Sequence, residues 1–149
     1  MAPMAVVVGP PGAGKTTVGQ AVADLLGVPF ADTDALIEAT AGKPIPEIFF
    51  DDGEAAFRAM EVDAIASSLE SFDGVLALGG GAILHHGTRT ALAAHTVVFL
   101  SVELADAVKR VGLGAGRPLY ASVATHTIAT DARTPEEIAD EVAALLKTR

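Results

Sequence analysis

The sequence contains no cysteine and no tryptophan, and aromatic residues make up only 5% of its 149 residues. Disulfide bonds and thiolate metal sites are therefore excluded. Few aromatic side chains are left for the stacking platforms on which proteins bind single-stranded nucleic acid. Basic residues are also scarce, with 10 against 19 acidic residues, and the formal charge of -9 argues against binding to nucleic acid or to an anionic membrane surface.

Long hydrophobic runs are absent as well. No stretch reaches the roughly 18 apolar residues of a membrane span, and residues 1–4 lack the basic start of a signal peptide. Half of the residues are nevertheless hydrophobic, which is typical of a chain that buries a core. We therefore expect a cytoplasmic protein that forms one domain over residues 1–149, since domains most often have about 100–150 residues.

Short apolar segments alternate with helical patterns along the chain. Segments that are apolar on both faces, as buried parallel strands are, occur at 5–8, 75–78 and 96–100, with weaker candidates at 29–31 and 127–129. Helical patterns cover about 16–26, 34–41, 52–70, 87–94, 103–111 and 135–147. Thr134-Pro-Glu-Glu137 is a capping box that begins the last helix. This alternation predicts a three-layer α/β fold with a parallel sheet.

The clearest motif is Gly9-Pro-Pro-Gly-Ala-Gly-Lys-Thr16, which matches the phosphate-loop pattern G-x-x-x-x-G-K-[ST]. It follows a predicted strand and precedes a predicted helix, which is the context that the motif requires. Its glycines let backbone N–H groups approach phosphates closely, and the helix presents its positive end to them. Lys15 is expected to reach the β- and γ-phosphates, and the Thr16 hydroxyl to bind Mg²⁺. The motif predicts a site for a nucleoside triphosphate.

Asp32 and Asp34 follow the second predicted strand. Because side chains alternate along an extended segment, both carboxylates are expected on one side, near the phosphate loop. Asp32 is a candidate for orienting a water on Mg²⁺, and Asp34 for accepting a proton from an attacking hydroxyl. The alternative interpretation is that these acids only begin a helix and stabilise its positive end.

Arg58 lies on a predicted helix, with Glu54 four residues before it and Glu61 three residues after it. A guanidinium group can bind a carboxylate through two hydrogen bonds, so Arg58 is a candidate for holding a substrate carboxylate while the glutamates fix its position. The alternative is an exposed helix face with weak ion pairs.

Three glycines, Gly79, Gly80 and Gly81, come directly after the third predicted strand, at the sheet edge where parallel sheets bind ligands. Without side chains, this backbone can approach a bound molecule closely, whereas a plain strand-to-helix turn rarely needs three glycines.

A glycine-rich stretch at 112–117 ends in Arg117 and follows Arg110. An arginine-bearing loop of this kind can close over ATP and neutralise charge on the transferred group, and the alternative is a flexible surface loop. His85 and His86 have no acidic or cysteine partner at metal-binding spacing, so we interpret them as ordinary loop residues.

Taken together, these motifs resemble those of the shikimate kinases. The shared elements, in the family's order and over nearly the whole chain, are the phosphate loop 9–16, Asp32-Thr-Asp34, Asp52-Gly-Glu with Phe57-Arg58 and Glu61, Gly79-Gly-Gly81, Arg117-Pro-Leu119 and Arg133-Thr-Pro135. The resemblance implies a monomeric nucleoside-monophosphate-kinase-like P-loop fold with a five-stranded parallel sheet of order 2-3-1-4-5. It also implies Mg²⁺-dependent transfer of the ATP γ-phosphate to the 3-hydroxyl of shikimate, in the pathway to chorismate and the aromatic amino acids.

The same resemblance assigns roles to individual residues. Asp34 would bind the substrate hydroxyls and act as the base, with Lys15 and Arg117 as further catalytic groups. Arg58 would hold the shikimate carboxylate, and Gly79, Gly80 and Gly81 would line the shikimate site, whose region spans about 33–61. Thr16 and Asp32 would hold the metal. The implied nucleotide contacts are Gly12, Ala13, Gly14, Lys15, Thr16, Thr17, Arg110, Arg117, Arg133 and Pro135.

The chain departs from the family at one place. Shikimate kinases carry about 20 further residues between an Arg-Pro-Leu that opens a lid and a second arginine-bearing segment ending in Pro-Leu-Tyr. Here Arg117-Pro-Leu119 meets Tyr120 at once, which leaves a lid remnant at about 112–120. Either the segment is truly shorter, and Arg117 serves only one of two arginine roles, or the natural chain contains residues that this sequence lacks; we favour the second explanation.

Two other functions fit part of the pattern. One is a different small-metabolite kinase on the same fold, such as a gluconate kinase. The other is a nucleotide-binding module that has lost its lid and its catalytic activity. A carboxylate-binding Arg58 and the glycines from Gly79 to Gly81 favour shikimate over gluconate.

Overall fold

The computed structural model describes residues 3–102 and 117–147, with only the backbone described at 117 and 118. The elements in chain order are β1 (Ala5–Val8), α1 (Lys15–Leu26), β2 (Phe30–Asp32), α2 (Thr33–Ala41), α3 (Ile45–Asp52), α4 (Glu54–Ser71), β3 (Val75–Ala77), the 3-10 helix η1 (Ala82–Leu84), α5 (His86–Leu92), β4 (Val97–Ser101), α7 (Arg117–Val123), β5 (His126–Ala129) and α8 (Pro135–Lys147). The strands form one parallel sheet of order β2-β3-β1-β4-β5. The predicted α/β fold and strand order are confirmed.

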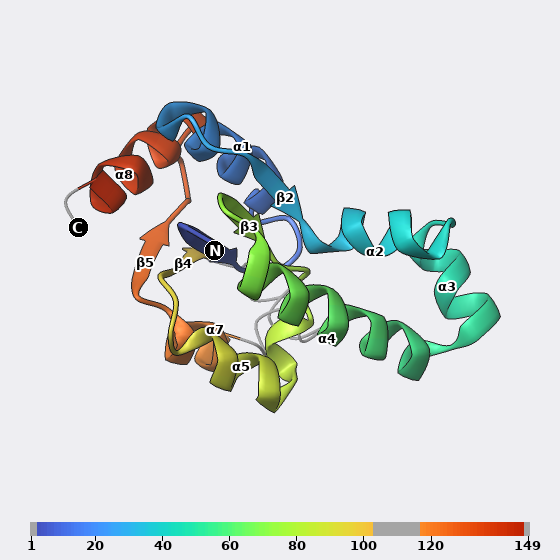
Figure 1. The fold of residues 1–149 in the computed structure, drawn as a ribbon. Helices are drawn as coiled ribbons and strands as arrows, with labels where there is room; N and C mark the ends of the chain where they lie inside the picture. The colour runs from blue at the N-terminus through green and yellow to red at the C-terminus, as the bar shows by residue number, and fades with distance from the viewer. Residues whose placement is uncertain (1–2, 103–116, 148–149) are drawn as a thin grey trace.

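The central strand β1 shows how the three layers arise. All four of its residues are buried, and their side chains alternate between the two faces of the sheet. Ala5 and Val7 pack in the cluster that contains side chains of α1 and α8, and Val6 and Val8 pack in the cluster that contains side chains of α4, α5 and α7. Figure 1 shows these two groups of helices on opposite sides of the sheet.

The last helix, α8, begins as its capping box predicts. The Thr134 Oγ1 accepts a hydrogen bond from the Glu137 backbone N at 3.1 Å, and the Glu137 Oε1 accepts one from the Thr134 backbone N at 3.1 Å. From this start, Ile138 and Val142 are carried into the core beside α1. The expected capping box is therefore confirmed.

The structure also contains elements that the sequence patterns did not predict, namely α3, η1 and α7. The helix predicted over about 52–70 is confirmed as α4, and the unpredicted α3 ends just before it, at Gly53, whose φ of 88° lies in the left-handed region that favours glycine. The bend lets α2, α3 and α4 enclose a separate cluster of Ile37, Ile48 and Phe57, at the side of the molecule farthest from α8 in Figure 1. The helix predicted at 103–111 lies outside the described residues.

The sheet order brings three loops to one edge. Strand β3 pairs with both β1 and β2, so the segments that follow these three parallel strands emerge next to one another. They are the phosphate loop after Val8, the residues around Asp32, and the glycines after Leu78. This is the carboxyl edge of the sheet, where α/β proteins bind their ligands. In the described part of the chain, no helix has both the length and the apolarity needed to cross a membrane.

Candidate active site

The phosphate loop joins β1 to α1 by a tight backbone path. Gly12 and Gly14 have φ angles of 83° and 89°, so both need the left-handed conformation that residues with a Cβ rarely adopt. Gly14 is the N-cap of α1, and no described side chain caps this helix start. The first backbone N–H groups of α1 therefore remain available for an anion, and the helix dipole favours negative charge there.

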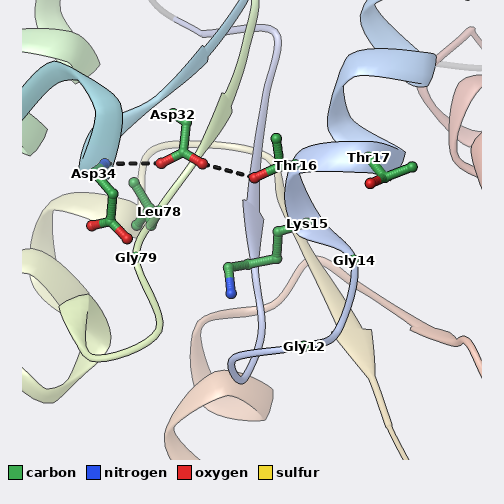
Figure 2. Close-up of a pocket in the computed structure, with 9 residues that line it drawn as sticks. All are labelled: Gly12, Gly14, Lys15, Thr16, Thr17, Asp32, Asp34, Leu78 and Gly79. Atoms are coloured by element: carbon green, nitrogen blue, oxygen red, sulfur yellow. Dashed lines mark hydrogen bonds between the residues drawn. The ribbon is translucent and has the colours of Figure 1, made fainter.

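Lys15 lies within the curve of this loop, where Figure 2 shows its ammonium group below Thr16. Its Nζ donates hydrogen bonds to the backbone O of Gly9 at 2.9 Å and of Pro10 at 3.2 Å. Burial lowers the pKa of Lys15, and the charges of Asp32 and Asp34 act in the opposite direction. The ammonium group of Lys15 is thus held by the phosphate loop and interacts with the charges of two acidic side chains.

Asp32 connects the second strand to the phosphate loop. Its Oδ1 accepts a hydrogen bond from the Asp34 backbone N, and its Oδ2 accepts one from the Thr16 Oγ1, both at 2.8 Å. The first bond makes Asp32 the N-cap of α2, which was the structural interpretation of this acid. The second places its carboxylate beside the hydroxyl expected to bind a metal, so the two interpretations of Asp32 are compatible.

A pocket opens between the phosphate loop and the end of β2 (Figure 2). Most of the side chains and backbone segments that line it belong to motifs that the sequence singled out. The lining residues are Gly12, Gly14, Lys15, Thr16, Thr17, Asp32, Asp34, Leu78 and Gly79. The structure therefore brings the expected phosphate-binding, metal-binding and base residues to one pocket.

Asp34 lies in the first turn of α2 and reaches this pocket. Its pKa is raised above the ordinary 3.8, first by burial and then by the negative charges of Asp32 and Glu61, with Lys15 opposing the shift. A raised pKa makes the carboxylate a better proton acceptor than an exposed aspartate. This environment is typical of a general base.

Arg58 lies on α4 with its guanidinium beside Gly81, and it is not among the residues that line the pocket. Its two neighbouring glutamates are not equivalent. Its Nη1 donates to the Glu61 Oε1 at 2.9 Å, whereas its Nε lies 3.6 Å from the Glu54 Oε2. The Glu61 side chain is only 4% exposed, while that of Glu54 is 68% exposed. The guanidinium also lies 5.2 Å from the centre of the Phe57 ring. Arg58 is therefore held mainly by a buried carboxylate, while its own side chain is 38% exposed, and its role as a carboxylate ligand stays a prediction.

The glycines after β3 lie against three parts of the site. A Cβ added at Gly79 would come within 2.5 Å of the Asp34 Oδ1, and one at Gly81 within 2.8 Å of the Arg58 Nη1. At Gly80 the added atom would lie 2.9 Å from Pro11 in the phosphate loop. A side chain at any of these positions would displace a neighbouring group, and a simple turn does not explain all three contacts.

Two residues that hold this segment were missed by the sequence analysis. The buried Thr33 accepts a hydrogen bond on its Oγ1 from the Gly79 backbone N at 3.2 Å, and Tyr120 donates one to the Gly80 backbone O. Thr33 lies between Asp32 and Asp34, and only those two acids had been assigned a chemical role from the sequence. The contact of Tyr120 joins residues that are 40 positions apart in the sequence. No local pattern signals either contact, because both depend on the tertiary fold.

The arginines assigned to the nucleotide give a mixed result. Arg110 lies outside the described residues, as does the side chain of Arg117. Arg133 donates to the Ala129 backbone O at 2.9 Å and forms an ion pair with Glu141 at 2.6 Å. Arg133 and Pro135, the first residue of α8, are not among the residues that line the pocket. Contacts between these residues and a nucleotide stay predictions.

Comparison with known proteins identifies the family. A family model described as shikimate kinase matches residues 11–122. The chain belongs to the shikimate kinase family. A shikimate kinase from Salinispora arenicola is 63% identical over 98% of this chain and 99% of its own length. The predicted family, the kinase activity and the transfer to shikimate are therefore confirmed.

Solved structures agree with this assignment. The structure titled shikimate kinase from Acinetobacter baumannii in complex with shikimate has a TM-score of 0.89 and 32% identity, and the match covers 99% of this chain and 94% of that one. A gluconokinase from Sinorhizobium meliloti matches with a TM-score of 0.54 and 24% identity, over 97% of this chain and 91% of that one. At this identity, the gluconokinase shares the fold alone.

The chain is shorter than its relatives within the matched region. The alignment with the Salinispora arenicola enzyme spans 165 positions, whereas this chain has 149 residues, so at least 16 positions of the alignment have no residue here. A shorter chain agrees with the departure noted between Arg117 and Tyr120, although the alignment length does not locate the unmatched positions.

Proposed function

We propose that Asp34 is the general base of a phosphoryl transfer from ATP to the 3-hydroxyl of shikimate. One observation carries this proposal: the same pocket is lined by the phosphate-loop residues Lys15 and Thr16 and by an aspartate with a raised pKa. The carboxylate accepts the proton of the attacking hydroxyl while Lys15 stabilises charge on the β- and γ-phosphates. Phosphoryl transfer depends mainly on positioning and charge stabilisation, and this arrangement supplies both.

The nucleotide is bound chiefly by backbone groups of the phosphate loop. Gly12, Ala13 and Gly14 offer backbone N–H groups, and the positive end of α1 adds to the attraction for the phosphates. Thr16 and Thr17 follow at the start of the helix. Arg110, Arg117, Arg133 and Pro135 complete the proposed nucleotide contacts, with Arg117 placed as a third catalytic group on the resemblance of its motif.

The acceptor lies on the other side of the pocket, in the region of about 33–61 and beside the glycines after β3. Arg58 binds the shikimate carboxylate through the N–H groups that Glu61 leaves available. Gly81 supports this role, because a side chain at that position would collide with the guanidinium. Gly79 and Gly80 line the same side of the acceptor and keep its approach to Asp34 open.

Mg²⁺ would be held by Thr16 and Asp32. Their oxygens belong to a hydrogen-bonded pair, and oxygen is the ligand that Mg²⁺ prefers. The described residues contain no group of three or more histidine, cysteine, aspartate or glutamate side chains suited to a metal. That composition fits Mg²⁺, which usually takes one or two protein ligands together with phosphates and waters. When bound, the ion neutralises negative charge on the phosphates.

The remaining expectations concern the whole molecule. We propose that the 149 residues form a single domain with its own acceptor-binding region, which the separate cluster under α2, α3 and α4 supports. A monomer in the cytoplasm, with ATP and shikimate as its partners, agrees with the size of the chain. Its net charge of -9 supports the expectation that it binds neither nucleic acid nor a membrane.

The shorter segment before Tyr120 is open to a direct measurement. An intact mass of the natural protein close to 15.1 kDa would mean that the segment is truly short and that Arg117 serves one arginine role only. A larger mass would mean that the natural chain contains the residues missing here, as we favour.

An assay of ADP release tests the proposed function. We expect release that requires both shikimate and Mg²⁺, with little release when gluconate replaces shikimate or when the metal is chelated. Shikimate-independent release at the full rate would point to simple ATP hydrolysis, and binding of ATP without any release to a module that has lost catalysis. Turnover with gluconate but not shikimate would overturn shikimate as the acceptor in favour of a gluconate kinase.

The pH profile of the enzyme is a second test. Because Asp34 accepts a proton only when ionised, kcat/KM should fall as pH falls through the raised pKa of Asp34. Glu61 contributes to that rise, so Glu61→Gln removes a negative charge, lowers the pKa of Asp34 and moves the acid limb of the profile to lower pH. The position of the limb is diagnostic even if the variant is slower overall. A limb that stays in place, or moves to higher pH, would exclude Asp34 as the titrating base.

A further inference from the structure

We propose that Tyr120 is a positioning residue for the transfer reaction, because its hydroxyl fixes the Gly80 carbonyl and thereby sets the spacing between Asp34, the phosphate loop and Arg58. The inference rests on the proposed roles of Asp34 and Arg58. It adds to them a residue that is distant in sequence and outside the pocket itself.

The setting of Tyr120 makes it a firm anchor. Tyr120 is only 5% exposed. Its ring stacks on the ring of Phe99 in β4, with the ring centroids 5.2 Å apart and an angle of 23° between the planes. The Tyr120 Oη donates a hydrogen bond to the Gly80 backbone O at 2.5 Å. Burial raises the pKa of Tyr120, so the hydroxyl keeps the proton that it donates.

The glycine segment is held from its other end by Thr33. The Gly79 backbone N donates to the Thr33 Oγ1 at 3.2 Å, and Thr33 is fully buried. Thr33 directly precedes Asp34, so this bond links the segment to the proposed base. Two side chains from different elements, α2 and α7, therefore fix the peptide group before Gly79 and the one after Gly80.

The hydrogen bonds from Tyr120 and Thr33 affect the groups that contact the three glycines. Gly79 lies against the Asp34 carboxylate, Gly80 against Pro11 in the phosphate loop and Gly81 against the Arg58 guanidinium. A displacement of the segment would therefore change the place of the base, the donor loop and the carboxylate ligand relative to one another. Transfer rates are sensitive to such displacements.

Three consecutive glycines have no side chains with which to fix their own conformation. Glycine loses more conformational freedom on folding than any other residue, so a segment of this composition needs external anchors. A larger side chain at any of the three positions would displace Asp34, Pro11 or Arg58. Tyr120 and Thr33 supply by hydrogen bonding the restraint that side chains within the segment do not provide.

Tyr120→Phe is the sharpest test, since it removes one oxygen and keeps the stacked ring. We expect kcat to fall about tenfold and the KM for shikimate to rise, because the acceptor side depends on the spacing that the segment sets. The Kd of a non-hydrolysable ATP analogue should stay near that of the parent, because the phosphate loop is anchored independently by β1 and α1. Hydrogen exchange in the peptide containing Gly79, Gly80 and Gly81 should accelerate.

Ser122→Ala is the matched control. It also removes a hydroxyl from α7, but the Ser122 Oγ donates to the Leu119 backbone O within the same helix, at 2.7 Å. It should change neither the kinetics nor the exchange of the glycine segment. In the double variant Tyr120→Phe with Thr33→Val, the losses in kcat/KM should be non-additive, because both residues restrain one segment.

The outcomes separate this inference from the proposed function. If the parent shows no shikimate-dependent ADP release, the proposed function fails. If the parent is active, the inference is overturned when Tyr120→Phe lowers only the melting temperature and leaves kcat, the shikimate KM and the exchange rates unchanged. It is also overturned when the affinity for the ATP analogue falls as much as kcat does, since the loss would then reflect general damage to the fold.

Discussion

Asp34→Asn is expected to lower kcat by about 100- to 10,000-fold, the range that a positioned general base contributes. The substitution keeps the shape of the side chain but removes its ability to accept a proton from the attacking hydroxyl. Binding of a non-hydrolysable ATP analogue should be retained, because Lys15 and the backbone of the phosphate loop bind the phosphates. The measurements are steady-state ADP release with saturating shikimate and a titration with the analogue.

Asp24→Asn provides the control for this result. Asp24 lies near the carboxyl end of α1, at the opposite end of the helix from Lys15, and accepts a hydrogen bond from Gln20 at 3.0 Å. Its replacement removes the same charge from the chain and should leave kcat near that of the parent. Similar rates for Asp34→Asn and the parent would show that another group accepts the proton, and a parallel loss of nucleotide affinity would show that Asp34 acts on the donor side.

Arg58→Ala is expected to raise the KM for shikimate about 10- to 100-fold, since a hydrogen bond to a charged group contributes about 1.5–3 kcal/mol. The KM for ATP should change little, because Arg58 lies on the acceptor side of the glycine segment. Arg58→Lys should restore only part of the affinity, because an ammonium group keeps the charge but lacks the planar pair of donors that fits a carboxylate. Initial rates measured over a range of shikimate concentrations distinguish these cases.

Lys43→Ala is a suitable control for Arg58→Ala. Lys43 lies between α2 and α3 and pairs with Asp51 at 3.1 Å and with Asp52 at 2.9 Å. Removing this cation changes the charge of the same region without touching Arg58 or its partner Glu61, and should leave the shikimate KM near the parent value. An unchanged KM in Arg58→Ala itself would return Arg58 to the alternative interpretation, an exposed helix face with weak ion pairs.

Much of the fold was predictable because its signals are local. The strands β1, β3 and β4 are short apolar runs that are buried on both faces, and such runs are typical of a parallel sheet. The capping box at Thr134 was predictable for the same reason, since both of its hydrogen bonds span three residues. By contrast, α3 was not predicted, and the boundary between it and α4 depends on the backbone conformation of Gly53.

The candidate site divides in a similar way. The residue types and spacings of the phosphate loop, the two aspartates and the three glycines each predict a chemical role. The sequence also showed that glutamates flank Arg58. It did not show that the side chain of Glu61 is buried and that of Glu54 exposed. That difference decides which partner fixes the guanidinium, and it arises from the way α4 packs against the rest of the fold.

The sequence by itself determined which groups are present: a phosphate loop, an aspartate pair, an arginine and a segment of three glycines, within an acidic chain that lacks cysteine. Only the tertiary structure decided how these groups meet. Parallel pairing of β3 with both β1 and β2 brings three loops to one edge, where burial and neighbouring charges raise the pKa of Asp34. The bond from Tyr120 to Gly80 depends on the same cause, because contacts between distant residues are set by packing and leave no local pattern in the chain.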